Sequence, residues 1–187
     1  MRAAVSDRAK ALLSLGVVLG LGAVGTMAAW TDDATSTSTF STGTVDLQLN
    51  DEIDDDYAFT TLGLTGMVPG NSMAAALPVQ NKGSLPFTYT LAGAATNTDT
   101  QNLAGQLQLE VKTGATVAGA GSAKTCSGGT SVVSRTGLVG TAVTIPDTLA
   151  AGATRDLCFQ VSLSASAPTG LQGATTTATF TFQATNS

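Results

Sequence analysis

The chain of 187 residues contains no histidine, two cysteines, one tryptophan and two glutamates. Without histidine, the Ser-His and Cys-His arrangements of hydrolases cannot form, and a histidine-based zinc motif is excluded. The sequence also lacks a glycine-rich phosphate loop and a dinucleotide-binding fingerprint. Clustered carboxylates could in principle supply acid–base chemistry, but no aromatic platform accompanies them. The residues therefore argue against an enzyme, a metalloprotease included.

Positive charge is scarce as well, with 8 Lys and Arg against 13 Asp and Glu. From Trp30 onward there are 5 positive and 12 negative residues, a net charge of −7. Nucleic acid phosphates and anionic lipid headgroups attract proteins mainly through Lys and Arg. We therefore expect no nucleic-acid partner, and contact with a membrane only through the apolar N-terminal segment while it is still attached.

That N-terminal segment has the features of an export signal. Three positive residues in 1–10 precede an uncharged, largely apolar run over 11–29, and small residues come just before Trp30. The run is 19 residues long, close to the ~20 that span a bilayer, but its four glycines lower its helix propensity. We predict a signal helix over 1–29, cut between Ala29 and Trp30, and hence a secreted or cell-surface protein. Retention as an anchor is the alternative.

Cys126 and Cys158 are the only cysteines. In an exported protein an even pair indicates a disulfide. Closing the loop between the two cysteines would contribute about 3 kcal/mol to the stability of the fold in the chain-entropy model. A redox or metal-binding pair is the other interpretation. Two thiolates without histidine do not complete a zinc site.

The abundance of Thr, Ser, Ala, Gly and Val, with few strong helix formers, predicts β-strands. Alternating apolar residues place strands at 44–49, 72–81, 86–91, 106–112, 155–163 and 174–184, with a weaker one at 132–134. The segments 137–145 and 148–152 bracket a turn. Residues 57–64 are expected to add apolar side chains to the core, and residues 102–104 to form a helical turn. An extended loop is expected over 113–130, and a turn at 146–147.

About eight strands with no sustained helical period are typical of an all-β, two-sheet sandwich, either jelly-roll or immunoglobulin-like. The sequence leaves the choice between these topologies open. The expected organisation is a signal peptide (1–29), an extended N-terminal arm (30–42) and one β-sandwich domain (43–187).

The arm over 30–42 is rich in serine and threonine and has two interpretations. It is either a frayed tail that spaces the cleavage site from the fold, or a donor strand that adds to a sheet edge of another copy. In the second case Trp30, Ala34 and Phe40 would fill pockets of the neighbour. Such a head-to-tail contact does not close, and it builds a filament.

An acidic loop follows the first predicted strand and could bind calcium through Asp51, Glu52, Asp54, Asp55 and Asp56. Calcium prefers several converging carboxylate oxygens, but the spacing does not match an EF-hand loop. A solvated acidic turn is the simpler interpretation. No other cofactor is expected.

Several short motifs resemble the TasA/camelysin family of exported proteins of Gram-positive bacteria. They are GTMAAWTD at 25–32, FSTGTVDL at 40–47, MVPG at 67–70 and VQNKGSL at 79–85. The resemblance covers roughly the first 90 residues and is most specific at the signal and the first strand. The composition and the cysteine pair look like an actinobacterial branch of the family.

The resemblance implies cleavage before Trp30 by a SipW-type signal peptidase, a β-sandwich, and assembly into extracellular fibres with other copies through the N-terminal strand. Camelysins are described as metalloproteases, an activity that a chain without histidine is not expected to share. The sequence thus predicts an exported structural subunit. The alternative is a monomeric surface binding module, stabilised by calcium.

Overall fold

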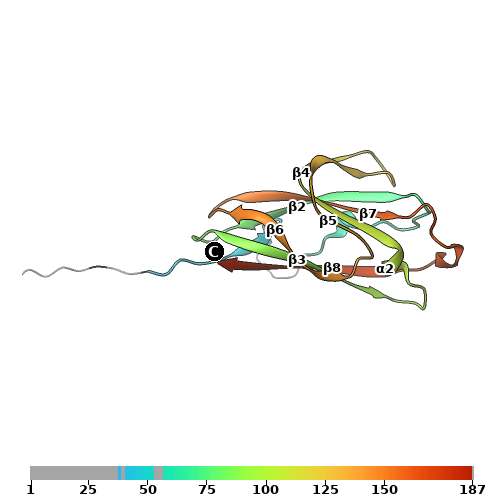
Figure 1. The fold of residues 1–187 in the computed structure, drawn as a ribbon, viewed down its shortest axis with the longest axis horizontal. Helices are drawn as coiled ribbons and strands as arrows, with labels where there is room; N and C mark the ends of the chain where they lie inside the picture. Colours follow the sequence, from blue (N-terminus) through green and yellow to red (C-terminus); the bar gives the residue numbers. More distant parts are fainter. Residues whose placement is uncertain (1–37, 39–40, 53–56, 187) are drawn as a thin grey trace, which may run out of the picture. The chain divides into compact units, whose positions relative to one another are not determined.

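The structure is a computed structural model that describes residues 38, 41–52 and 57–186. The chain divides into two compact units, residues 1–40 and 41–187, and the second holds every described strand. This unit is an all-β sandwich of two sheets, as predicted (Figure 1). Among the described residues, no helix is both long and apolar enough to cross a bilayer. The predicted signal helix over 1–29 lies outside them.

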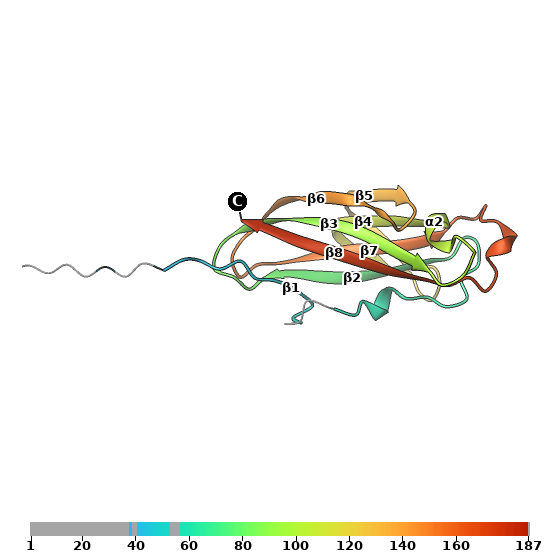
Figure 2. The ribbon, with the colours of Figure 1, turned by 90° about the horizontal axis from the view of Figure 1, so that it is seen from below.

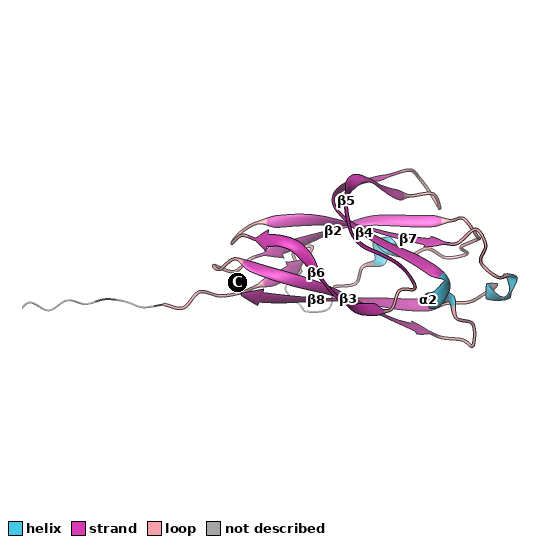
Figure 3. Ribbon diagram, in the orientation of Figure 1, coloured by secondary structure: helices cyan, strands magenta, loops and turns pink. Residues whose placement is uncertain are grey.

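All paired strands are antiparallel. The larger sheet has the order β1-β2-β7-β4-β5 and contains β1 (Leu47–Leu49), β2 (Ser72–Asn81), β7 (Thr154–Leu163), β4 (Leu107–Ala118) and β5 (Thr125–Thr136). The smaller sheet has the order β6-β3-β8 and contains β6 (Gly140–Leu149), β3 (Phe87–Asn97) and β8 (Thr176–Asn186). Three short helical turns complete the fold (Figure 3): η1 (Thr60–Leu62), α2 (Leu103–Gln106) and η2 (Thr169–Leu171).

The strand pairs follow the nested order of a jelly roll. β4 pairs with β5, β3 with β6, and β2 with β7, as in one long hairpin that is rolled into two sheets. The next pair in this series would join β1 to β8. Instead, β1 is a three-residue strand that pairs with β2 in the other sheet (Figure 2). The outermost pair of the roll is therefore missing from the described chain.

The core lies between the two sheets and follows the alternation seen in the sequence. On β7, Leu157, Phe159 and Val161 point inward, whereas Cys158 lies on the outer face. β2 and α2 form where the sequence predicts a strand and a helical turn, and Tyr57 packs against the core as expected. The largest fully buried side chains are Tyr89, Phe87, Phe159, Leu77, Leu91, Leu109, Ile145 and Leu157.

The predicted loop over 113–130 is wrong, because most of this stretch forms the distal half of the β4–β5 hairpin. Backbone pairing continues as far as Ala118 opposite Thr125. Gly128 and Gly129 both have positive φ, 72° and 69°, a conformation that glycine adopts at little cost. Small and polar residues occupy this half of the hairpin, so it carries no apolar alternation.

The turn predicted at Pro146-Asp147 is also wrong, because β6 continues through both residues. Phe87 pairs with Leu149 and Tyr89 with Ile145, so β6 has two more residues than β3 between these pairs. The extra residues form a bulge, a place where a strand tolerates proline. The chain therefore bends at this point without reversing.

A disulfide joins Cys126 on β5 to Cys158 on β7, which confirms the predicted pairing. The tip of the hairpin is also held at the start of β2. There, the Ser72 N–H donates to Ser122 O (2.8 Å) and the Lys124 N–H donates to Ser72 O (3.2 Å). The disulfide therefore fastens the hairpin over the outer face of the five-stranded sheet.

We expect the double substitution Cys126→Ala/Cys158→Ala to lower the free energy of unfolding by about 3–4 kcal/mol, because it releases a loop closed across 32 residues. Urea denaturation followed by circular dichroism measures the change. The wild-type protein in a strong reductant is the control and should approach the variant. Equal stability of the variant and the oxidised wild-type protein would contradict this role.

Tyr89 is a buried polar residue with an unusual environment. Its side chain is 1% exposed, and its hydroxyl has no hydrogen-bond partner within the described part of the chain. Burial raises the pKa of Tyr89 to about 12, partly offset by the positive charge of Arg155. Between pH 10 and pH 12 the unfolded chain therefore loses this proton while the folded chain keeps it.

Because the folded-state pKa is the higher one, Tyr89 contributes stability that is complete below pH 10 and is lost as the pH rises toward 12. We expect Tyr89→Phe to leave stability at pH 7 unchanged or slightly higher, since the lost hydroxyl is unpaired. The variant should also lose less stability than the wild type above pH 10. Denaturation curves from pH 8 to pH 11.5 test this, and identical slopes in both proteins would refute it.

Candidate functional site

The open edge of β8 is the feature that distinguishes this sandwich from a complete roll. In the part of the chain that the structure describes, β8 pairs only with β3, from Phe87 opposite Asn186 to Asn97 opposite Thr176. Its other edge presents backbone N–H and C=O groups with no strand beside them. Such an edge is a template for the addition of another strand.

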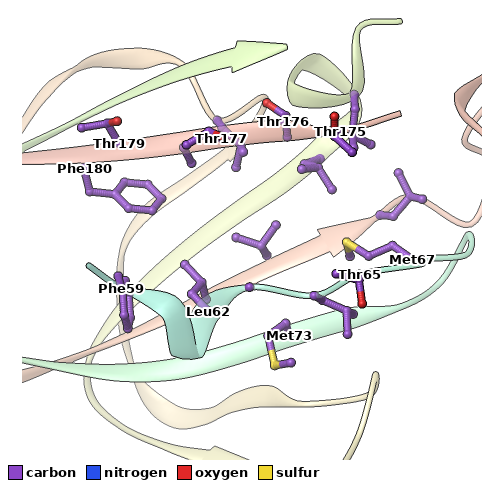
Figure 4. Close-up of a pocket in the computed structure, with 18 of the residues that line it drawn as sticks. Phe59, Leu62, Thr65, Met67, Met73, Thr175, Thr176, Thr177, Thr179 and Phe180 are labelled. Carbon is purple, nitrogen blue, oxygen red and sulfur yellow. The ribbon is translucent and has the colours of Figure 1, made fainter. Parts of the chain in front are cut away.

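A groove of about 1590 Å³ runs beside this edge (Figure 4). One wall is formed by Thr175 and by β8 over residues 176–182, and the other is the irregular segment 57–69, which precedes β2. In Figure 4, Phe59 and Leu62 lie across the open space from Phe180. The principal apolar side chains in the lining are Phe59, Leu62, Met67, Leu103, Leu163 and Phe180.

Two aromatic side chains of the groove lining contact the buried core. Phe159 of β7 contacts Phe180 of β8 at a ring-centroid distance of 4.9 Å, and Phe59 meets the Phe159 ring edge-on at 5.4 Å. The Phe59 contact joins the segment 57–69 to the five-stranded sheet, and the Phe180 contact joins the two sheets. An apolar side chain that entered the groove would therefore extend the existing core.

The segment 57–69 fills the place beside β8 without acting as a strand. Three of its N–H groups donate to acceptors within the same stretch, for example Thr60 to Ala58 O (2.8 Å) and Gly63 to Thr60 O (3.1 Å), and the Val68 N–H donates to Asn71 Oδ1 (2.9 Å). It is thus held by side chains such as Leu62, which pack against the core. The edge of β8 stays available because this segment covers apolar surface but supplies no backbone partner to it.

The described lining of the groove contains no Asp, Glu, Lys, Arg or Cys. Besides apolar residues, it holds uncharged polar side chains such as those of Gln48, Thr60, Thr65 and Gln172. These side chains provide no nucleophile–base pair and no set of metal ligands. The arrangement is suited to bury an uncharged, partly apolar segment of extended backbone.

Of the acidic loop, Asp51 and Glu52 are described, and Asp54, Asp55 and Asp56 lie outside the described residues. Asp51 Oδ1 accepts hydrogen bonds from Lys82 Nζ (2.7 Å) and Gln80 Nε2 (2.8 Å), and these bonds, that of Lys82 first, lower the pKa of Asp51. No group of three or more possible metal ligands occurs among the residues with described positions. Calcium binding therefore stays a prediction.

The predicted cleavage site, Ala29 and Trp30, and the predicted donor residues Ala34 and Phe40 also lie outside the described residues. The sequence did not reveal the groove itself. The alternation of β8 predicted a strand but not an edge, because strand order depends on pairing between distant segments. The apolar residues of 57–69 predicted a contribution to the core but not an opening beside it.

We expect a protein of residues 43–187 to fold, because its buried apolar residues all lie between Ala74 and Leu163. This protein should bind a neutral apolar dye such as Nile red in the groove. Leu62→Gln should weaken dye binding about fivefold or more, since burying a leucine side chain against the dye contributes at least about 1 kcal/mol to binding. Val139→Gln is the matched control, because Val139 is 61% exposed and lies outside the groove. Equal dye binding by all three proteins would contradict the assignment.

The comparisons with known proteins agree with the motifs noted above. The family model described as camelysin metallo-endopeptidase matches residues 8–115, which is more than half of the chain. A search of curated proteins found no match. Proteins of this family are generally extracellular or located at the cell surface, and membership is consistent with an exported structural protein. The chain therefore belongs to the camelysin family, which is also the TasA family.

Proposed function

We propose that this protein is the subunit of an extracellular or cell-surface fibre. The N-terminal arm of one copy, residues 30–42, adds as a strand to the open edge of β8 in the next copy and covers the groove there. The missing outermost pair of the roll is the observation that carries this proposal. A donated strand would supply the backbone partner that β8 lacks.

The composition of the arm fits the chemistry of the groove. Residues 34–42 carry no charge, as does the described lining of the groove. In an extended strand alternate side chains share a face, so Trp30, Ala34 and Phe40 all point the same way. Nine extended residues span about 30 Å, close to the ~27 Å of residues 175–182 that border the groove. Phe40 would bring an aromatic ring to a groove already lined by aromatic side chains.

This contact joins two different surfaces of the subunit, and it therefore does not close on itself. Each copy keeps a free arm at one end and a free groove at the other, so that repeated addition builds an open filament. Backbone hydrogen bonds along the strand would supply affinity, and side chains in the groove would supply specificity.

Export and processing complete the proposal. A SipW-type signal peptidase would cut between Ala29 and Trp30, and this cut would release the arm from the membrane. Before that cut, the chain would be held at the membrane only by its signal. The role is structural and not catalytic, as supported by the absence of histidine from the sequence and of charged side chains from the described lining of the groove.

Assembly can be tested with two forms of the purified protein, one beginning at Trp30 and one at Gly43. We expect filaments from the first form in negative-stain electron microscopy and monomers from the second in gel filtration. Excess 43–187 protein should also shorten the filaments, because it offers grooves but no arm. Monomers from both forms would overturn the proposal in favour of a monomeric binding module. Filaments from both would show that the arm is not the donor.

Two positions on β8 provide a matched pair of variants. Ala178 faces the core side of the strand and lines the groove, whereas Gln183 is exposed on the opposite face and lies outside the groove lining. Ala178→Glu should abolish filament formation, because it places a charge where the donated strand must pack. Gln183→Glu adds the same charge to the outer face and should leave filaments intact. Equal behaviour of the two variants would contradict the location of the acceptor site.

A further inference from the structure

Two of the camelysin-like motifs, at 40–47 and 79–85, meet at the end of the sandwich where β1 begins. We name the contact the exit clasp, formed by residues 43–46 and 81–85. Its hydrogen bonds run from the Lys82 N–H to Asp46 O (2.8 Å), from the Ser84 and Leu85 N–H groups to Thr44 O (3.0 and 3.1 Å), and from the Thr44 N–H to Ser84 Oγ (2.9 Å).

Glycine is required on the 81–85 side of the exit clasp. A Cβ atom at Gly83 would overlap Thr44 O and would lie 2.8 Å from Asp46 N, so the two backbones approach there more closely than any other residue type allows. On the other side, a Cβ atom at Gly43 would overlap the side chain of Leu85. Gly83 has no left-handed φ, so alanine at this position would disturb the contact and not the turn itself.

The 81–85 side of the exit clasp is fixed to the core by Asn81, which is fully buried. Its Nδ2 donates to Leu85 O (2.9 Å) and Leu149 O (3.0 Å), and its Oδ1 accepts from the Gly83 N–H (3.0 Å). The amide is thus satisfied within the turn and by β6. Residues 43–46 therefore rest on a part of the domain that is firmly held.

The exit clasp sets the direction in which the chain enters the domain. β1 starts beside Asn81, and residues 44–46 continue the line of β1 past the end of β2. β8 ends at the same end of the sandwich, with Asn186 opposite Phe87. An arm that covered its own groove would have to run parallel to β8 and reverse direction within 43–46. The hydrogen bonds of the exit clasp hold those residues on the line of β1 instead.

Such a restraint is needed in any subunit that carries both arm and groove. A segment tethered by a short flexible linker reaches its own site at an effective concentration on the order of millimolar, well above usual protein concentrations. Self-insertion would therefore outcompete assembly unless the geometry of the linker forbids it. We infer that the exit clasp prevents the arm from completing its own subunit and so directs it to a second copy, an inference that rests on the proposed function.

The test uses the full chain, exported and processed, in four versions: wild type, Gly83→Ala, Ser84→Ala and Gly170→Ala. Gly83→Ala forces residues 44–46 away from the turn. Ser84→Ala removes only the hydrogen bond that the Thr44 N–H donates to Ser84 Oγ, so that folding is preserved in at least one variant. Gly170→Ala is the matched control, because a Cβ atom there meets nothing within 4 Å. Electron microscopy measures filaments, and chymotrypsin cleavage after Phe40 in the monomer fraction reports whether the arm is covered.

We expect filaments from the wild type and from Gly170→Ala, with rapid cleavage after Phe40 in their monomers. The two clasp variants should lose filaments and give folded monomers in which Phe40 is protected. Clasp variants that assemble like the wild type would refute this inference and leave the proposed function intact, as would monomeric variants with an unprotected Phe40. A wild-type protein that forms no filaments would remove the proposed function and this inference with it.

Discussion

The unpaired edge of β8 is the constraint on which the interpretation of this fold depends. Sheet proteins usually cover or interrupt a free edge, since exposed backbone groups invite pairing with other chains. Here the edge borders a groove lined by Phe180, whose ring contacts the buried ring of Phe159. The segment 57–69 covers part of the apolar surface, and among the described residues β8 has a backbone partner only on the β3 side. The domain is therefore stable as a sandwich and incomplete as a roll.

The two ends of the proposed assembly place opposite demands on the chain. The acceptor groove must stay open, whereas the donor must leave the domain in a direction that does not lead back to that groove. Hydrogen bonds between Thr44 and the 81–85 turn meet the second demand near the start of β1. The glycines at positions 43 and 83 serve this contact, which gives a physical reason for two of the motifs in which the chain resembles the camelysin family.

The sequence predicted those parts of the fold that depend on local alternation. β2 lies at the predicted residues 72–81, and the inward and outward faces of β7 follow from the pattern around Cys158. It did not predict the pairing of 113–118 with 125–130, because threonine, glycine and alanine carry no apolar period there. The groove was equally hidden, since strand order depends on long-range pairing. The donor residues of the arm lie outside the described chain, so their role rests on the sequence.

Hydrogen exchange along β8 tests the central claim most directly. The account predicts that alternate backbone amides of β8, on the edge away from β3, exchange rapidly in the 43–187 protein and slowly in filaments of the 30–187 protein. Amides of β7, which is paired on both sides, serve as the internal reference. Equal exchange of β8 in the two preparations would contradict the account, because the edge would then gain no partner on assembly.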